Sequence, residues 1–142
     1  IGALGFSLGA SVAIMNKNDD IKAIVSDSAY SNLNNMMEVM YKNFYFLKYP
    51  FVQLTRIYSK IFFNVDPKEV SPANAIKNIN KPVLVIHGKK DKQIPVNEAY
   101  LLHNANKKTE LWIVDANHGE IYVLNKEEYE NKVLSFFEKH LK

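Results

Sequence analysis

A serine near the start of the chain lies in a glycine pattern that can support nucleophilic chemistry. Ser7 is the centre of GFSLGA (5–10), which fits G-x-S-x-G. An apolar run (1–4) precedes it and a segment of small residues follows, so the pattern predicts a strained strand-to-helix turn that exposes the hydroxyl. Small residues two positions before and after the serine let strand and helix pass closely. Such a turn points the backbone N–H of Leu8 at a developing oxyanion.

A serine hydroxyl is a weak nucleophile and needs a base that an acid holds in place. The chain has four histidines. His118 lies in the loop segment DANHGEIY after the last apolar run, beside a glycine, and is the candidate base. His103 and His140 lie on predicted helices and are expected at the surface. His87 ends a predicted strand, which favours a structural role.

Two aspartates compete for the role of the acid. Asp91, in HGKKDKQIP, follows the end of one predicted strand, and Asp27 follows another. Open α/β sheets bind their ligands at the carboxyl ends of the strands, so both positions are suitable. We favour Asp91, which lies four residues after the strand that ends at His87 and just before the helix that Pro95 begins. Ser7, Asp91 and His118 follow the chain order Ser…Asp…His of one known class of triads. Asp115 is close to His118 in sequence, and a role in the turn suits it better.

Alternating apolar runs and helical patterns must position these residues. Continuous apolar runs separated by helices are typical of a parallel sheet that is covered on both faces. The sequence therefore predicts an α/β fold with about four parallel strands and flanking helices. Strands are expected at 1–4, 21–26, 82–87 and 110–114, and the clearest helices at 8–15, 95–105 and beyond residue 125.

One segment interrupts this alternation. Residues 31–70 hold two helical patterns, which we expect Pro50 to separate, and nine aromatic residues fall between Tyr41 and Phe63. Two interpretations are compatible with each other. The helices cover the core, or they form a lid over a pocket that receives an apolar substrate group. The expected organisation is one domain, 1–142, with a helical insert at 31–70.

Composition excludes several classes of function. The net charge of +3 is spread along the chain, with no basic-aromatic motif for nucleic acid. No apolar run reaches the roughly 18 residues of a membrane span. The absence of cysteine and of a visible charged leader favours a cytoplasmic protein. Neither a dinucleotide or P-loop motif nor a metal-ligand spacing such as H-E-x-x-H occurs, so no cofactor or metal is expected.

Four motifs, in order along the chain, together resemble the C-terminal part of the α/β-hydrolases. They are GFSLGA, DSAYSN, SPANAI…PVLVIHGKKDKQIP and NHGEIY, and the resemblance covers 1–142. The chain is most similar to bacterial serine hydrolases of the esterase and prolyl-oligopeptidase-like branch. The resemblance implies a catalytic triad of Ser7, Asp91 and His118, with Leu8 in the oxyanion hole.

The resemblance also implies that much of the fold precedes residue 1. In the α/β-hydrolases the serine turn follows the fifth of eight strands, and an upstream loop donates the second oxyanion N–H. The first strand here is then an open edge, which favours self-association through that strand. We therefore expect a fragment with weak or no activity of its own.

The expected function of the full-length protein is serine hydrolysis through an acyl-enzyme. Its partner would be a small-molecule ester, thioester or amide whose apolar group lies near residues 36–63. Two alternatives stay open. The same triad could transfer the acyl group to an acceptor other than water, or the chain could be a non-catalytic binding or oligomerising module.

Overall fold

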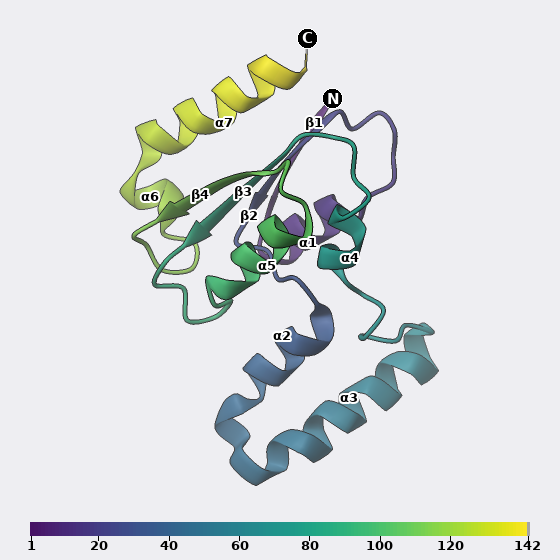
Figure 1. The fold of residues 1–142 in the computed structure, drawn as a ribbon. Coiled ribbons are helices and arrows are strands. Elements are labelled where there is room, and N and C mark those ends of the chain that lie inside the picture. Colours follow the sequence, from purple (N-terminus) through teal and green to yellow (C-terminus); the bar gives the residue numbers. More distant parts are fainter. Residues whose placement is uncertain (142) are drawn as a thin grey trace. The chain divides into compact units, whose positions relative to one another are not determined.

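The computed structural model describes residues 1–141, which divide into two compact units. One unit combines 1–31 with the chain from residue 72 onward, and the other is formed by 32–71 (Figure 1).

The first unit is built on a parallel sheet. Its four strands lie side by side in the order β1-β2-β3-β4, and every neighbouring pair is parallel. This confirms the predicted α/β class and the four strands, whose predicted ends lie within two residues of the observed ones. The strands are β1 (Gly2–Phe6), β2 (Ala23–Asp27), β3 (Val83–Gly88) and β4 (Glu110–Val114).

Helices cover both faces of this sheet (Figure 1). One face carries α1 (Leu8–Met15), α4 (Pro72–Ile76) and α5 (Asn97–Ala105), and the other carries α6 (Ile121–Leu124) and α7 (Lys126–His140). Successive side chains of β2 and β3 therefore enter two different cores. Ile24 and Val83 pack on the α1 side, whereas Val25 and Leu84 pack on the α7 side. Burial on both faces explains why the central strands are continuous apolar runs rather than alternating ones.

The regular secondary structure of the second unit is entirely helical. It contains α2 (Leu33–Met40), the 3-10 helix η1 (Lys42–Leu47) and α3 (Lys48–Phe63). Asn32 caps α2, because its side chain accepts hydrogen bonds from the backbone N–H groups of Asn34 and Asn35 at 2.9 and 3.3 Å.

The prediction that Pro50 separates the two helices of this unit is wrong. Pro50 lies in the first turn of α3, where a missing backbone N–H breaks no helical hydrogen bond. The change of direction occurs instead at Tyr45, inside η1, whose φ of 49° is left-handed. No helix in the described part of the chain is both long and apolar enough to span a bilayer.

Candidate active site

Ser7 lies at a tight turn between β1 and α1. Its backbone is strained, with φ 53° and ψ −118°, as the strand-to-helix pattern predicts. Gly5 permits this turn, because a Cβ there would lie against the carbonyl of Gly9 and 2.6 Å from the backbone nitrogen of Ala10. Gly9 itself faces open space, so the structure gives no steric reason for a glycine at that position. The Ser7 N–H donates to the backbone carbonyl of Asp27 at 2.8 Å, which anchors the turn to the neighbouring strand.

The structure brings Ser7, His118 and Asp91 into one chain of hydrogen bonds. His118 Nε2 lies 3.2 Å from Ser7 Oγ, and His118 Nδ1 lies 2.6 Å from Asp91 Oδ2. The Asp91 side chain is fully buried and that of His118 is 11% exposed. This arrangement can take the proton of the serine hydroxyl while the carboxylate holds the imidazole in the tautomer that accepts it.

The Asp91 carboxylate is fixed by the loop that carries it. Its second oxygen, Oδ1, accepts hydrogen bonds from the backbone N–H groups of Gln93 and Ile94 at 2.9 and 2.8 Å. His87 supports the same loop, because its Nε2 lies 2.8 Å from the Ile94 carbonyl and 3.5 Å from Asp91 Oδ2. His87 is thus completely buried behind the acid and does not contact Ser7.

The loop of His118 is shaped by two neighbours. Gly119 adopts a left-handed φ of 76°, which a glycine tolerates without strain. The ring of Phe6, the residue before the serine, lies 5.0 Å from the His118 ring. The contact between Phe6 and His118 does not follow from spacing along the chain. The structural role expected for His87, in contrast, agrees with its complete burial.

Asp27, the alternative acid, has different partners. Its carboxylate accepts hydrogen bonds from Ser28 Oγ at 2.9 Å and from the hydroxyl of Tyr129 at 3.1 Å. Burial raises the pKa of this carboxyl above its ordinary value. Asp115, in contrast, is exposed and pairs with Lys90 at 2.8 Å. Geometry therefore separates Asp91 from both other aspartates.

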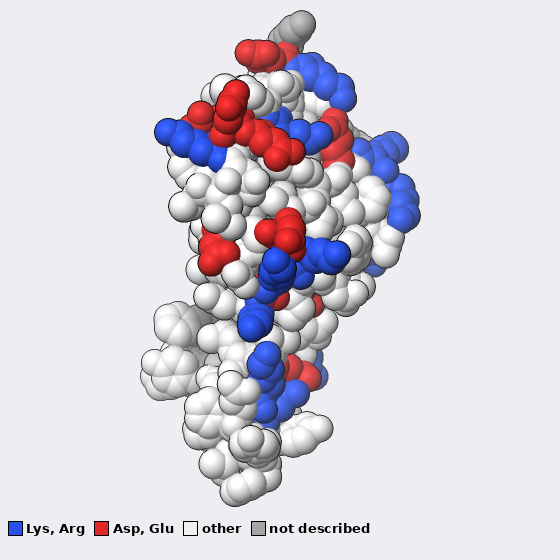
Figure 2. Space-filling view, turned by 90° about the vertical axis from the view of Figure 1, so that its left-hand side faces the viewer, with Lys and Arg blue, Asp and Glu red and all other residues white. Residues whose placement is uncertain are grey.

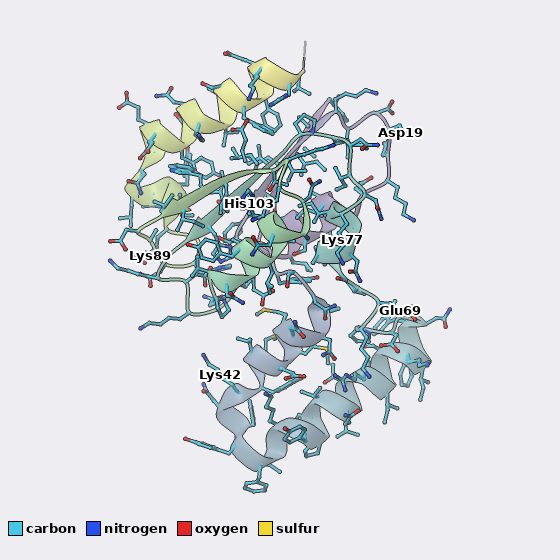
Figure 3. The ribbon with its side chains drawn as sticks, viewed as in Figure 1. Asp19, Lys42, Glu69, Lys77, Lys89 and His103 are labelled. Atoms are coloured by element: carbon cyan, nitrogen blue, oxygen red, sulfur yellow. The ribbon has the colours of Figure 1, made fainter. Side chains whose placement is uncertain are left out.

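Leu8, His103 and His140 are the other residues that the sequence analysis considered. The N–H of Leu8 is the first of α1 and makes no hydrogen bond to any described residue, so it is free to donate to an oxyanion. His103, on α5 (Figure 3), is half-buried and bonds Thr109 through Nδ1 at 2.8 Å. His140 lies near Glu110, at 3.7 Å. Both histidines are half-buried rather than fully exposed at the surface as expected, because each packs against a residue outside its own helix. Neither contacts the candidate site.

An apolar pocket of about 390 Å³ adjoins this site. Two of its residues, Phe6 and Gly119, are the direct neighbours of Ser7 and His118 in the chain. The pocket is lined by Leu4, Phe6, Asp27, Gly119, Tyr122 and Tyr129. Within residues 1–141, no group of three or more His, Asp or Glu side chains is placed to hold a metal ion.

The chain is similar over its whole length to a known protein family. The family described as the prolyl oligopeptidase family matches residues 1–142, the whole chain. The chain belongs to the prolyl oligopeptidase family. This confirms the resemblance to the α/β-hydrolases.

Solved structures place this prolyl oligopeptidase family chain among esterases and peptidases of the same fold. The Pyrococcus furiosus esterase Pf2001 is 29% identical, with a TM-score of 0.75, over all of this chain and 55% of the esterase chain. The Pyrococcus horikoshii acylaminoacyl peptidase shares the fold, at 21% identity and a TM-score of 0.70, over all of this chain and 24% of that one.

A curated relative is similar over the same extent. It is the uncharacterized protein YqkD of Bacillus subtilis (strain 168), 26% identical over 145 residues, which covers 97% of this chain and 48% of the relative. The chain thus spans about half the length of YqkD and of the esterase.

Proposed function

We propose that this member of the prolyl oligopeptidase family is a serine hydrolase that cleaves carboxylic esters, thioesters or small amides. The observation that supports the proposal most is the pair of hydrogen bonds that links Ser7 Oγ, His118 and Asp91, at 3.2 and 2.6 Å. These three residues come from loops after three different strands, and local structure alone does not bring them together.

The reaction would proceed in two halves. Ser7 Oγ attacks the carbonyl carbon while its proton passes to His118 Nε2, and the Leu8 N–H donates to the oxyanion. The bond to the leaving group then breaks as His118 returns the proton to it, which leaves the acyl group on Ser7. Water next attacks this acyl-enzyme with His118 as the base, and the acid and free Ser7 are released. Asp91 holds the imidazole throughout and stabilises its charged form.

An apolar substrate group is supported by the pocket beside Phe6 and Gly119. Its walls are mostly aliphatic and aromatic, and its volume of about 390 Å³ suits a small acyl or alcohol group. An ester substrate is also supported by the esterase among the similar structures. The lid role of residues 31–70 and the acyltransferase alternative remain predictions, and product analysis with added alcohols would detect acyl transfer.

Covalent labelling of the serine tests the proposal. A fluorophosphonate probe would be incubated with this chain and with a form extended at its N-terminus, and the intact mass would be measured. We expect an adduct on the extended form that is lost in Ser7→Ala and kept in Ser135→Ala, which removes an exposed hydroxyl on α7. Absence of the adduct from a folded extended form, or its persistence in Ser7→Ala, would overturn the proposal.

A further inference from the structure

The second unit contains a continuous segment with cations and aromatic rings but no acid. Residues 42–65, KNFYFLKYPFVQLTRIYSKIFFNV, include four Lys or Arg side chains and eight Phe or Tyr side chains, and neither Asp nor Glu. This composition is typical of helices that lie in the interface of a membrane, with basic residues beside aromatic and aliphatic ones.

Helix α3 turns its polar face towards its own unit. Arg56 donates to the Asn34 side chain of α2, with Nε at 2.7 Å, and Thr55 Oγ1 lies 3.1 Å from the Tyr41 hydroxyl. Val52 is the buried apolar residue of this helix. The inner face of α3 is therefore held in its unit by hydrogen bonds as well as by the packing of Val52.

The opposite face of α3 carries an exposed apolar stripe. Leu54, Ile57 and Ile61 are 60%, 55% and 70% exposed, and Tyr58 and Phe62 lie beside them. The spacing of three and four residues places these side chains on one side of the helix. Together with Thr55 they line a shallow depression of about 420 Å³. Exposed apolar surface of this extent marks an interaction site in a folded protein.

Three further aromatic rings are exposed in η1 and in the first turn of α3. Tyr45, Phe46 and Tyr49 are 84%, 82% and 74% exposed. Aromatic rings are favoured at the level of lipid headgroups, where one end of the side chain is apolar and the other is hydrated. The stripe of Leu54, Ile57, Tyr58, Ile61 and Phe62 is called the α3 apolar face, and the three rings lie near it in the chain.

The positive charges of residues 42–65 favour one kind of binding partner over another. Lys42, Lys48 and Lys60 accompany the α3 apolar face, and residues 42–65 contain no carboxylate. Lys48 pairs with Glu38 of α2 at 3.5 Å, so the positive charge of the segment comes chiefly from the other lysines. Figure 2 shows blue lysine and arginine atoms among white side chains on this face of the molecule, with a few red acidic atoms beside them, and Figure 3 labels Lys42. A second copy would bring the same positive charges together, whereas an anionic lipid surface is complementary to them.

We propose that residues 42–65 bind the surface of an anionic phospholipid bilayer. Helix α3 lies along the interface, with Leu54, Ile57 and Ile61 among the acyl chains and the lysine side chains at the headgroups. At 16 residues, α3 is suited to lie on a bilayer rather than to cross it. The proposal does not depend on the function proposed for Ser7, and it carries its own test.

Co-sedimentation with vesicles provides the test. The chain would be mixed with vesicles of phosphatidylcholine alone and with vesicles containing about 30% phosphatidylserine, at low and high salt. We expect binding to the anionic vesicles that weakens as salt rises, because screening removes the contribution of the lysines. Binding that is equal for both compositions, or that is absent, would overturn the proposal.

Two variants separate the apolar contribution from the charged one. Ile57→Gln with Ile61→Gln should lower the affinity for anionic vesicles at least tenfold, because both side chains leave water on binding. Lys42→Gln with Lys60→Gln should lower it by about tenfold and reduce the salt dependence. Circular dichroism checks folding, and if the isoleucine variant does not fold, the lysine variant decides.

A matched control removes comparable apolar surface elsewhere. Val12→Gln with Leu134→Gln changes two side chains that are 51% and 57% exposed in the other unit. Vesicle binding should be unchanged, and a loss equal to that of the isoleucine variant would contradict the proposal. An isoleucine variant that dissociates an oligomer without affecting vesicle binding would instead assign the α3 apolar face to contact between copies of this chain.

Discussion

At the residue scale, two buried carboxylates at the ends of neighbouring strands differ in what they bind. Asp91 follows β3 and directs one oxygen at His118 and the other at two backbone N–H groups. Asp27 ends β2 and is held by Ser28 and Tyr129. The same residue type therefore contacts a histidine ring in one place and links β2 to α7 in the other.

Substitution of each carboxylate by its amide should separate these roles. Asp91→Asn places an amide against His118 Nδ1 and disfavours the tautomer that accepts the serine proton, and such a change lowers turnover by about 10⁴-fold in a serine triad. We expect the fluorophosphonate labelling rate of Ser7 to fall at least 10³-fold, on the order of that effect. Asp27→Asn should change it less than about tenfold, because Asp27 does not contact His118. Equal losses in the two variants would contradict the assignment of the acid.

The buried Asp27 carboxyl predicts a pH dependence of stability. Burial raises its pKa above 3.8, opposed by hydrogen bonds from Ser28 and Tyr129 and by the nearby His87 and His118. The folded chain then holds this proton more tightly than the unfolded chain, so the group's contribution to the free energy of unfolding falls as pH rises through the raised pKa.

Asp27→Asn removes this contribution. The free energy of unfolding of the wild type minus that of the variant should therefore decrease as the pH rises from 3.8 through the raised pKa of Asp27. Urea unfolding at several pH values measures it. A difference that increases with pH would show that the carboxylate is stabilised by its surroundings rather than penalised by burial.

At the scale of elements, the turn between β1 and α1 depends on how closely the strand approaches the helix. Gly5 lies where any side chain would meet the backbone of Gly9 and Ala10, whereas a Cβ on Gly9 meets no atom within 4 Å. The fold therefore requires a glycine at position 5 but not at position 9, although the G-x-S-x-G pattern contains both.

Alanine at each glycine should give opposite effects on stability. Gly5→Ala should lower the free energy of unfolding by about 1–3 kcal/mol or more, as expected for overpacking against backbone. Gly9→Ala, inside α1, should raise it by up to about 1 kcal/mol, because alanine loses less conformational entropy in a helix. Urea denaturation measures both, and a destabilised Gly9→Ala variant would mean that its surroundings are more crowded than the structure indicates.

At the scale of the whole molecule, the sheet has an open side. β1 pairs with β2 alone among the described strands, and its side chains Leu4 and Phe6 are 51% and 45% exposed. Unpaired backbone groups on an apolar edge favour pairing with another chain. Self-association through β1 therefore remains our prediction for this chain.

A lysine on the edge strand should weaken this association. Leu4→Lys adds a charge that edge strands commonly use against pairing, so the concentration-dependent mass of the wild type should shift towards the monomer. Analytical ultracentrifugation measures the shift. Leu134→Lys, at an exposed position of α7, is the control. A wild type that is monomeric at all concentrations would contradict the prediction.

Much of the first unit follows from the sequence alone. Continuous apolar runs predict buried parallel strands because side chains on both faces must leave water, and the strand ends agree with the structure within two residues. The order of Ser7, Asp91 and His118 after three of these strands then restricts them to one edge of the sheet, since the carboxyl ends of parallel strands lie together.

Only the tertiary structure decided which groups meet at that edge. Ser7 and His118 are 111 positions apart, and the choice between Asp91 and Asp27 depends on how loops and α7 pack against β2 and β3. The second unit shows the same limit, because the periodicity of α3 predicts an apolar face but not its direction. Arg56 bonds to Asn34 of α2 and Thr55 bonds to Tyr41, the residue after α2, so the apolar face of α3 points away from them. Such contacts between elements do not follow from local spacing.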